Sequence, residues 1–332
     1  MIRFAFDDIQ SGCVPRGSFI LLSPLLLALS AVAGAQNFPH KPIRVVVPFS
    51  AGTGTDILAR IVTDELRTTL GVNFVIDNRA GASGQIAAEL VARANPDGYT
   101  LFLSTNTPHS ANPFLFKKLN YDPVKDFAAV SRMIYYEFIL AVNPNSAIKT
   151  VPELIAYVKA NPGKTSYAFG NSTGQVNGAY FVSAAKIDSL PVPYKSTPPA
   201  MTDLIAGQVQ YMFVDAASSQ GHVKSGRLRA IAVMSDKRSS VTPDLPAVGE
   251  TVPGFDTVPW AGMFAPAGTP KAVVARLNSE IVNAINKPAI NQRLAEIGLQ
   301  PAPSTPAELD QLVKDQLKAW GKKIRDAGIQ PE

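Results

Sequence analysis

Residues 170–174, Gly-Asn-Ser-Thr-Gly, could take part in catalysis or in ligand binding, because they join a predicted strand to a predicted helix. In a serine hydrolase, a Gly-x-Ser-x-Gly turn of this kind presents the serine hydroxyl as the attacking nucleophile. The same glycine- and hydroxyl-rich turn can instead hold an anion at the N-terminus of the following helix, without any reaction. Ser172 therefore has two interpretations, a nucleophile or a hydrogen-bond donor.

A serine hydrolase also needs a histidine base, and the histidines of this chain are His40, His109 and His222. The order serine, acid, histidine can be met by Ser172, then Asp203 or Asp215, then His222. This order puts the whole triad in the middle of the chain, and no His-Gly-Gly-Gly segment precedes the serine. We therefore favour the anion-binding turn and keep an exported serine hydrolase as the alternative.

A dinucleotide or metal site finds less support. The segment VVVPFSAGTGTDIL offers a strand, Gly52-x-Gly54 and a helix, with Asp77 at the end of the next strand. The third glycine of that fingerprint is missing, because Ile57 stands at its position. The sequence has no His-Glu-x-x-His motif and no cluster of cysteine and histidine ligands. We expect no cofactor and no metal.

Two more loops share the glycine and hydroxyl character of the Ser172 turn. The three loops are residues 50–56, 104–107 and 170–176, and each follows an apolar strand and precedes a helix or turn. Open α/β sheets bind ligands beyond the carboxyl ends of their strands, and the free N–H groups of helix starts favour anions. The three loops together predict a site for a small anion.

The elements that would position these loops alternate along the chain. Apolar runs at 42–49, 73–78 and 100–105 predict strands, and residues 57–70 carry an apolar stripe of helical spacing that Gly71 ends. Further strands are predicted at 166–169, 211–215 and 228–234, and an apolar stretch follows at 260–268. Alternation of this kind indicates an α/β architecture with mainly parallel sheets.

Helix starts are marked most clearly in the second half of the chain. Thr150 with Glu153, and Thr305 with Glu308, have the spacing of a capping box. Pro270 follows Thr269 and is expected at the first position of another helix.

Composition and the N-terminus bound the class of protein. The chain has 332 residues, is 46% hydrophobic and only 17% charged, and its net charge of +5 is scattered, which disfavours nucleic acid as a partner.

An apolar run from Phe19 ends in Ala33-Gly34-Ala35, the small-x-small pattern of a signal peptide. Residues 1–35 are thus predicted to be cleaved, and the single cysteine, Cys13, would leave with them.

Long segments of the chain resemble the Bug family, the periplasmic substrate-binding receptors of tripartite tricarboxylate transporters. They are FPHKPIRVVVPFSAGTGTDILARIVTDELRTTLG, NRAGASG, ANPDGYTLFLSTNTPHSANPFLFKKLNYDPVKDFAAVSRM, PYKSTPPAMTDLIAGQVQYMFVD and FAPAGTPKAVVARLN. They follow one another in order over essentially the whole chain after residue 36.

The resemblance implies a two-lobed periplasmic-binding-protein fold of type II, the Venus flytrap, in which the chain crosses twice between lobes. Lobe 1 would comprise residues 36–137 and 259–332, and lobe 2 residues 138–258. A monomer would capture a small aliphatic or aromatic carboxylate in the cleft, without catalysis, and deliver it to a membrane permease with a large and a small subunit. A protein that presents the ligand to a signalling system would use the same fold and stays an alternative.

The resemblance also implies which residues bind. Family members commonly hold the ligand's carboxylate with backbone N–H groups, hydroxyls and bridging water, with little help from arginine. The Trp260 indole would cover the cleft. By their own chemistry, Asp56 would either bond the end N–H groups of the first helical turn or order its loop and a bridging water, and Asp215 would accept a hydrogen bond from a ligand hydroxyl or amino group or brace the loops of lobe 2. By position, the contacts are Phe49, Ala51, Gly52, Thr53, Gly54, Thr55, Asp56, Ser104, Thr105, Asn106, Asn171, Ser172, Thr173, Gly174, Gln175, Val176, Asp215 and Trp260.

The sequence departs from the family pattern in the loop of the second lobe. That loop usually reads Gly-x-Gly-Ser-x-x-His-Leu, and here Gly178 stands at the position of the family histidine. We expect a roomier pocket on this side, one that admits a bulkier or aromatic carboxylate.

Overall fold

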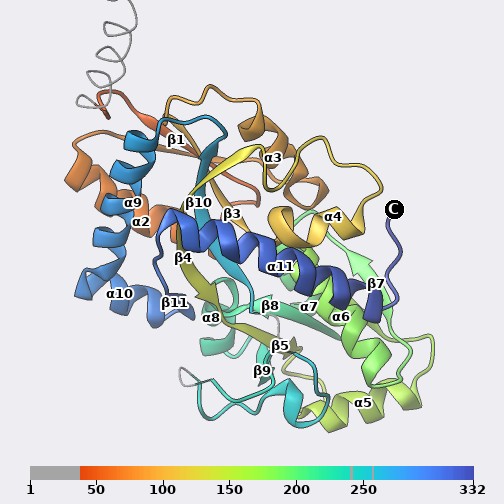
Figure 1. Ribbon diagram of the computed structural model, residues 1–332. Helices are drawn as coiled ribbons and strands as arrows, with labels where there is room; N and C mark the ends of the chain where they lie inside the picture. The colour runs from red at the N-terminus through yellow and green to blue at the C-terminus, as the bar shows by residue number, and fades with distance from the viewer. Residues whose placement is uncertain (1–37, 240–241, 256–257) are drawn as a thin grey trace, which may run out of the picture. The chain divides into compact units, whose positions relative to one another are not determined.

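The computed structural model describes residues 38–239, 242–255 and 258–332 (Figure 1). The predicted leader, residues 1–35, lies outside the described residues, and so does Cys13. Residues Pro39–Glu332 form one compact unit, and all that follows concerns this unit. Among the described residues, no helix is both long enough and apolar enough to span a bilayer.

The first of two sheets has six strands in the order β11-β4-β10-β3-β1-β2. β1 pairs in parallel with β2 and β3, whereas β10 runs antiparallel to both β3 and β4. The strands are β1 (Ile43–Val47), β2 (Phe74–Asn78), β3 (Thr100–Thr105), β4 (Phe127–Tyr136), β10 (Trp260–Pro266) and β11 (Leu299–Pro301).

The second sheet has five strands in the order β7-β6-β8-β5-β9, all from the middle of the chain. β6 pairs in parallel with β7 and β8, and β5 runs antiparallel to β8 and β9. The strands are β5 (Phe138–Val142), β6 (Ser166–Phe169), β7 (Leu190–Pro193), β8 (Tyr211–Asp215) and β9 (Arg229–Val233).

The chain passes between the two sheets twice. Glu137 alone separates β4 of the first sheet from β5 of the second, and β10 brings the chain back to the first sheet. The prediction of mainly parallel sheets is wrong, since five of the nine strand pairings are antiparallel. All five antiparallel pairings involve β4, β5 or β10, the strands next to the two passages between the sheets.

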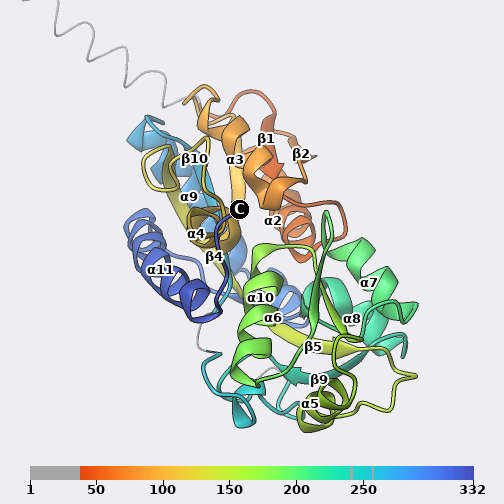
Figure 2. The same ribbon diagram turned by 90° about the vertical axis from the view of Figure 1, so that its right-hand side faces the viewer.

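Helices flank both sheets (Figures 1 and 2). Those of the first sheet's segments are α2 (Gly54–Leu70), η1 (Ala82–Gly84), α3 (Gln85–Ala92), η2 (Thr107–Ala111), α4 (Asn112–Leu115), α9 (Lys271–Asn286), α10 (Pro288–Ala295) and α11 (Pro306–Asp326). Those of the second are α5 (Val151–Ala160), α6 (Ser172–Ala184), α7 (Thr197–Ile205), α8 (Ala216–Lys224) and η3 (Val248–Glu250).

The predicted helix signals have local causes in the structure. Gly71 ends α2 in the left-handed conformation, at a φ of 68°, which a glycine adopts without strain. Thr305 and Glu308 form the predicted capping box at α11. The hydroxyl of Thr150 caps α5 as predicted, but the Glu153 carboxylate accepts from the N–H of Lys149 instead of Thr150. α9 begins one residue after Pro270, which is its N-cap.

A small apolar cluster ties the two sheets' segments together beside the loops of interest. Val176 of α6 packs in this cluster with Leu115 of α4 and with Trp320 and Ile324 of α11. All four side chains are almost fully removed from solvent. The start of α6 is therefore held against elements of the first sheet, although α6 follows a strand of the second.

His109 lies in the core of the first sheet. Its Nδ1 is 2.8 Å from the Ser104 hydroxyl, and its ring stacks on Phe264 with 4.0 Å between centroids. The imidazole is fully buried, and this burial lowers the pKa of His109 to about 3. The imidazole is therefore neutral in the folded protein at any pH near neutrality.

This burial predicts a loss of stability in acid. Between about pH 6.5, where an unfolded histidine titrates, and about pH 3 the unfolded chain binds the extra proton, so stability falls as the pH is lowered. Each pH unit in this range costs about 1.4 kcal/mol. Between pH 7 and pH 5, the free energy of unfolding of the wild type should therefore fall by about 2 kcal/mol more than that of His109→Gln. Urea unfolding at both pH values measures this difference, and equal losses in the two proteins would refute it.

Candidate binding site

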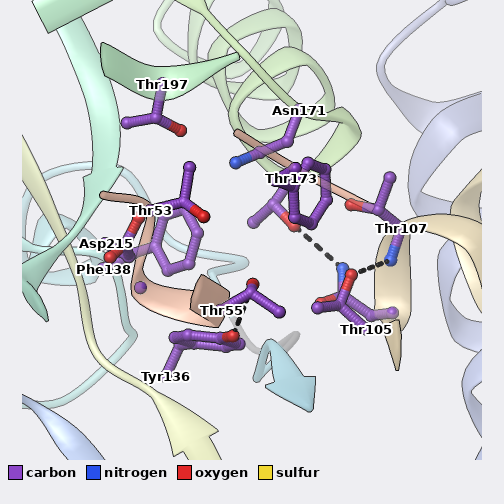
Figure 3. Close-up of a pocket in the computed structure, with 13 residues that line it drawn as sticks. Thr53, Thr55, Thr105, Thr107, Tyr136, Phe138, Asn171, Thr173, Thr197 and Asp215 are labelled. Carbon is purple, nitrogen blue, oxygen red and sulfur yellow. Dashed lines mark hydrogen bonds between the residues drawn. The ribbon is translucent and has the colours of Figure 1, made fainter. Parts of the chain in front are cut away.

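A small cavity lies where the loops of the two sheets meet (Figure 3). It is lined by residues from both sheets' segments, and threonine is the commonest type among them. They are Phe49, Thr53, Gly54, Thr55, Thr105, Asn106, Thr107, Tyr136, Phe138, Asn171, Thr173, Thr197 and Asp215.

Several helices begin at this cavity. Thr53 and Asn171, the N-cap residues of α2 and α6, both line it. Thr197, the first residue of α7, and Asp215, the N-cap of α8, line it as well. Helix starts carry partial positive charge because their first N–H groups lack intrahelical partners. The cavity thus acquires a positive potential from backbone alone.

The side-chain caps of α2 and α6 each bind one amide of the first helical turn. The Thr53 hydroxyl accepts a hydrogen bond at 3.4 Å from the N–H of Asp56, the third residue of α2. In the same way, Asn171 Oδ1 accepts from the N–H of Gly174, the third residue of α6, at 2.9 Å. The caps therefore satisfy the third amide of each helix. The first amide of α2, that of Gly54, donates to the Asp215 carboxylate, and residues of both helix starts line the cavity.

Hydroxyl and amide side chains complete the lining. The Thr55 and Tyr136 hydroxyls lie 2.8 Å apart, and Asn106 Nδ2 donates to the Thr173 hydroxyl at 2.9 Å (Figure 3). Thr105 accepts from the N–H of Thr107 at 3.2 Å. Among the described residues that line the cavity there is no lysine, arginine or histidine. An anion in this cavity would be held by neutral donors.

Asp215 is the exception in this neutral lining. Asp215 is buried, with a relative exposure of 5%. Its carboxylate accepts hydrogen bonds from the N–H and the hydroxyl of Ser218, each at 2.8 Å. Burial raises the pKa of the Asp215 carboxyl, and hydrogen bonds from Ser218 and from the Gly54 N–H offset only part of that rise. Gly54 belongs to the first sheet's segments, so Asp215 bridges the starts of α8 and α2.

Asp56 faces away from the cavity. Its carboxylate accepts from Arg60 at 2.9 and 3.0 Å, from Asn78 at 3.1 Å and from the N–H of Gly52 at 3.0 Å. Burial alone would raise the pKa of Asp56, but the hydrogen bonds from Arg60, Gly52 and Asn78 lower it below its usual range. Asp56 therefore orders the loop that precedes α2.

Polar pairs join the two sheets' segments around the cavity. Ser172 Oγ donates to Asn112 Oδ1 at 2.9 Å, and Ser196 Oγ donates to Ser50 Oγ at the same distance. The Asn106–Thr173 hydrogen bond is a third pair of this kind. The two sets of loops are thus in direct hydrogen-bonded contact.

The structure gathers half of the residues predicted to bind. Those that line the cavity are Phe49, Thr53, Gly54, Thr55, Thr105, Asn106, Asn171, Thr173 and Asp215. Those that do not are Ala51, Gly52, Asp56, Ser104, Ser172, Gly174, Gln175, Val176 and Trp260. Ligand contact by the first group stays a prediction.

Two of the residues outside the lining have other partners. The Ser104 hydroxyl pairs with His109 in the core. Trp260 is fully buried, with Phe102, Phe127 and Phe264 in its core cluster, because β10 begins with this residue and its indole joins the core of the first sheet. Its indole therefore does not cover the cavity.

Gly178 does not enlarge the cavity. It is buried within α6 and does not line the cavity, and a Cβ at this position would collide with the Tyr167 ring. The expectation of a roomier pocket is therefore wrong, because Tyr167 already fills the space beside Gly178.

Four lining residues were not among the predicted contacts, namely Thr107, Tyr136, Phe138 and Thr197, although Thr107 belongs to the predicted loop 104–107. Thr197 had a usable signal, since Ser-Thr-Pro-Pro marks a helix start like those of the other loops. Tyr136 and Phe138 flank Glu137 at the passage between sheets, and nothing in their apolar surroundings distinguishes them from core residues.

Comparison with known proteins points to one family. The family model described as "Tripartite tricarboxylate transporter family receptor" matches residues 58–329. Protein BugT of Bordetella pertussis is 31% identical over 305 residues, which cover 90% of this chain and 93% of BugT.

Two solved structures match along nearly their whole length. "R. palustris Rpa4515 with adipate" has a TM-score of 0.87 and 32% identity, and the match covers 89% of this chain and all of that one. "Structure of periplasmic binding protein BugD" has a TM-score of 0.84 and 34% identity, with the same coverage of both chains. The fold is therefore that of the periplasmic binding proteins, a Venus flytrap of two lobes.

The close approach of Gly54 to Asp215 makes a test of the geometry. A Cβ at residue 54 would collide with Asp215 Oδ1 and come within 3.2 Å of the Tyr136 ring, and Asp215 moves only by losing its bonds to Ser218. We expect Gly54→Ala to lower the free energy of unfolding by about 1–3 kcal/mol in urea.

Gly221→Ala is the matched control, because a Cβ there, in α8, meets no atom within 4 Å. It should leave the free energy of unfolding unchanged or raise it by up to about 1 kcal/mol. Equal stabilities of the two variants would show that α2 and Asp215 do not approach as described.

Proposed function

This chain belongs to the tripartite tricarboxylate transporter receptor family, together with the Bug proteins, and from this premise we propose that it captures a small organic carboxylate in its cavity. The loaded receptor then delivers the carboxylate to a membrane permease with a large and a small subunit. It works as a monomer in the periplasm, to which the predicted leader directs it.

One observation carries this proposal: the starts of α2 and α6, from opposite sheets, meet at a cavity, and the part of its lining that the structure describes has no cationic side chain. A carboxylate at one helix start gains up to about 2 kcal/mol when it is partly buried. A micromolar dissociation constant needs about 8 kcal/mol, so several helix starts and charge-assisted hydrogen bonds must act together. Neutral donors also suit a ligand that has to be released again.

The ligand printed for one relative supports the chemical class. The R. palustris structure holds adipate, a carboxylate, and its chain matches this one over its full length. The sequence identity of 32% is compatible with a different carboxylate here.

The lobes of the receptor follow from the passages between sheets. We assign residues 36–137 and 259–332 to lobe 1 and residues 138–258 to lobe 2. Ligand binding shifts an equilibrium between open and closed arrangements of the lobes, and the closed one is favoured by the pairs Ser172–Asn112 and Ser196–Ser50. The permease would then distinguish loaded from empty receptor by its surface.

The same proposal gives Ser172 a structural role in place of a catalytic one. Its hydroxyl is fully buried and donates to Asn112 Oδ1. Of the described histidines, His109 is engaged with Ser104 in the core. Ser172 is thus a contact between the proposed lobes.

Titration calorimetry of carboxylates against their primary amides tests the proposal. An amide keeps the shape of the acid but lacks its charge, so we expect it to bind at least tenfold more weakly, a loss of about 1.4 kcal/mol. Acids and amides of equal affinity would contradict a site built from helix starts. Failure of a broad panel of small carboxylates to bind would contradict the proposed function itself.

A further inference from the structure

The surface loop of residues 79–86 has an unusual backbone. Ala82 and Ser83 both adopt the left-handed conformation, with φ angles of 45° and 49°. Among the described residues, the only other non-glycine residue with a positive φ is Lys186. Left-handed backbone is unfavourable for a residue with a Cβ, so contacts from the rest of the fold must hold Ala82 and Ser83 in place.

The Asn112 side chain supplies one of these contacts. Its Nδ2 donates to the Ser83 carbonyl at 2.9 Å and to the Tyr121 hydroxyl at 3.4 Å, and its Oδ1 accepts from the Ser172 hydroxyl at 2.9 Å. Because the Ser83 carbonyl can only accept, Nδ2 must face it, and Oδ1 then faces Ser172. One fully buried amide therefore ties the loop to the start of α6, which follows a strand of the other sheet.

The backbone around Asn112 connects it with the cavity. η2 is a π-helix that ends at Asn112, whose N–H donates to the Thr107 carbonyl. Thr107 lines the cavity. Segments of π-helix are rare and are found frequently at functional sites. Asn112 thus lies a single π-turn from the cavity lining.

The loop also packs on two segments of the first sheet that reach the cavity. A Cβ at Gly84 would collide with Pro48 and come within 3.1 Å of Pro108. Pro48 precedes Phe49 and Pro108 follows Thr107, and both Phe49 and Thr107 line the cavity. The absence of a side chain at Gly84 lets the loop lie directly against both segments.

We propose that Asn112 couples the 79–86 loop to the position of lobe 2, so that the loop displays closure of the receptor on the surface of lobe 1. This inference rests on the proposed function for the open and closed arrangements of the lobes. In the closed arrangement Ser172 holds the Asn112 amide, and the amide holds the Ser83 carbonyl. When Ser172 withdraws, Oδ1 loses its donor, water competes for the amide, and the loop is released.

The change in the loop reaches the surface of the protein. Ala82 is exposed, and the exposed fraction of Ile86 is 51%. A held loop and a released loop therefore present different surfaces to a partner such as the permease. The signal lies outside the cavity, so a partner reads it without contact with the ligand.

Hydrogen–deuterium exchange of the ligand-free protein tests this coupling. The readout is the exchange rate of the Gly84 and Gln85 amides, which donate to carbonyls within the loop. We expect Asn112→Ala to speed this exchange about tenfold and Ser172→Ala to speed it about threefold. The double variant should exchange no faster than Asn112→Ala, because Ser172 acts on the loop only through Asn112.

Ser196→Ala is the matched control, because it removes another hydroxyl from the same boundary, the one that donates to Ser50, and leaves Asn112 unchanged. Its loop amides should exchange at the rate of the wild type. The amides of β1, in the core of the first sheet, should keep their rates in every variant.

Three results would each overturn the coupling. The first is unchanged exchange of the loop in Ser172→Ala, and the second is equal acceleration in Ser196→Ala or in β1. The third is an additive effect in the double variant. None of these results bears on carboxylate binding, because the exchange is measured without a ligand, and the titration of acids against amides tests the proposed function separately.

Discussion

Unpaired backbone amides at helix starts are the constraint on which this structure depends. An α-helix leaves its first N–H groups without partners, and these must find water, a side chain or a ligand. In this chain Thr53 and Asn171 satisfy one amide each, and residues at the starts of α2 and α6 line a shared cavity. A small anion is the partner that both the geometry and the potential favour.

Close approach of the two sheets' segments strengthens this arrangement. Gly54 lets the start of α2 reach Asp215, and Ser172 and Ser196 form hydrogen bonds across the same boundary. Removal of water from such a space makes each hydrogen bond to a charged ligand stronger than it would be on the surface. Closure and recognition therefore depend on the same residues.

Much of this could be predicted from the sequence, because strands, caps and glycine-rich loops are local features. The loops around Thr53, Thr105 and Asn171 were found in this way, and they do meet at the cavity. The direction of the strands could not be predicted from the sequence, since the antiparallel pairings arise only when β5 and β10 carry the chain between the sheets. The direction of a side chain could not be predicted either. For this reason Trp260 is expected at the cleft from the sequence, although it packs in the core.

The most direct measurement is a crystal structure of the protein with the carboxylate that binds most tightly in titration. The account predicts that the carboxylate oxygens lie in the cavity, about 2.7–3.2 Å from first-turn amides of α6 or α2 and from threonine hydroxyls. A carboxylate paired with a lysine or arginine, or bound outside this cavity, would contradict it.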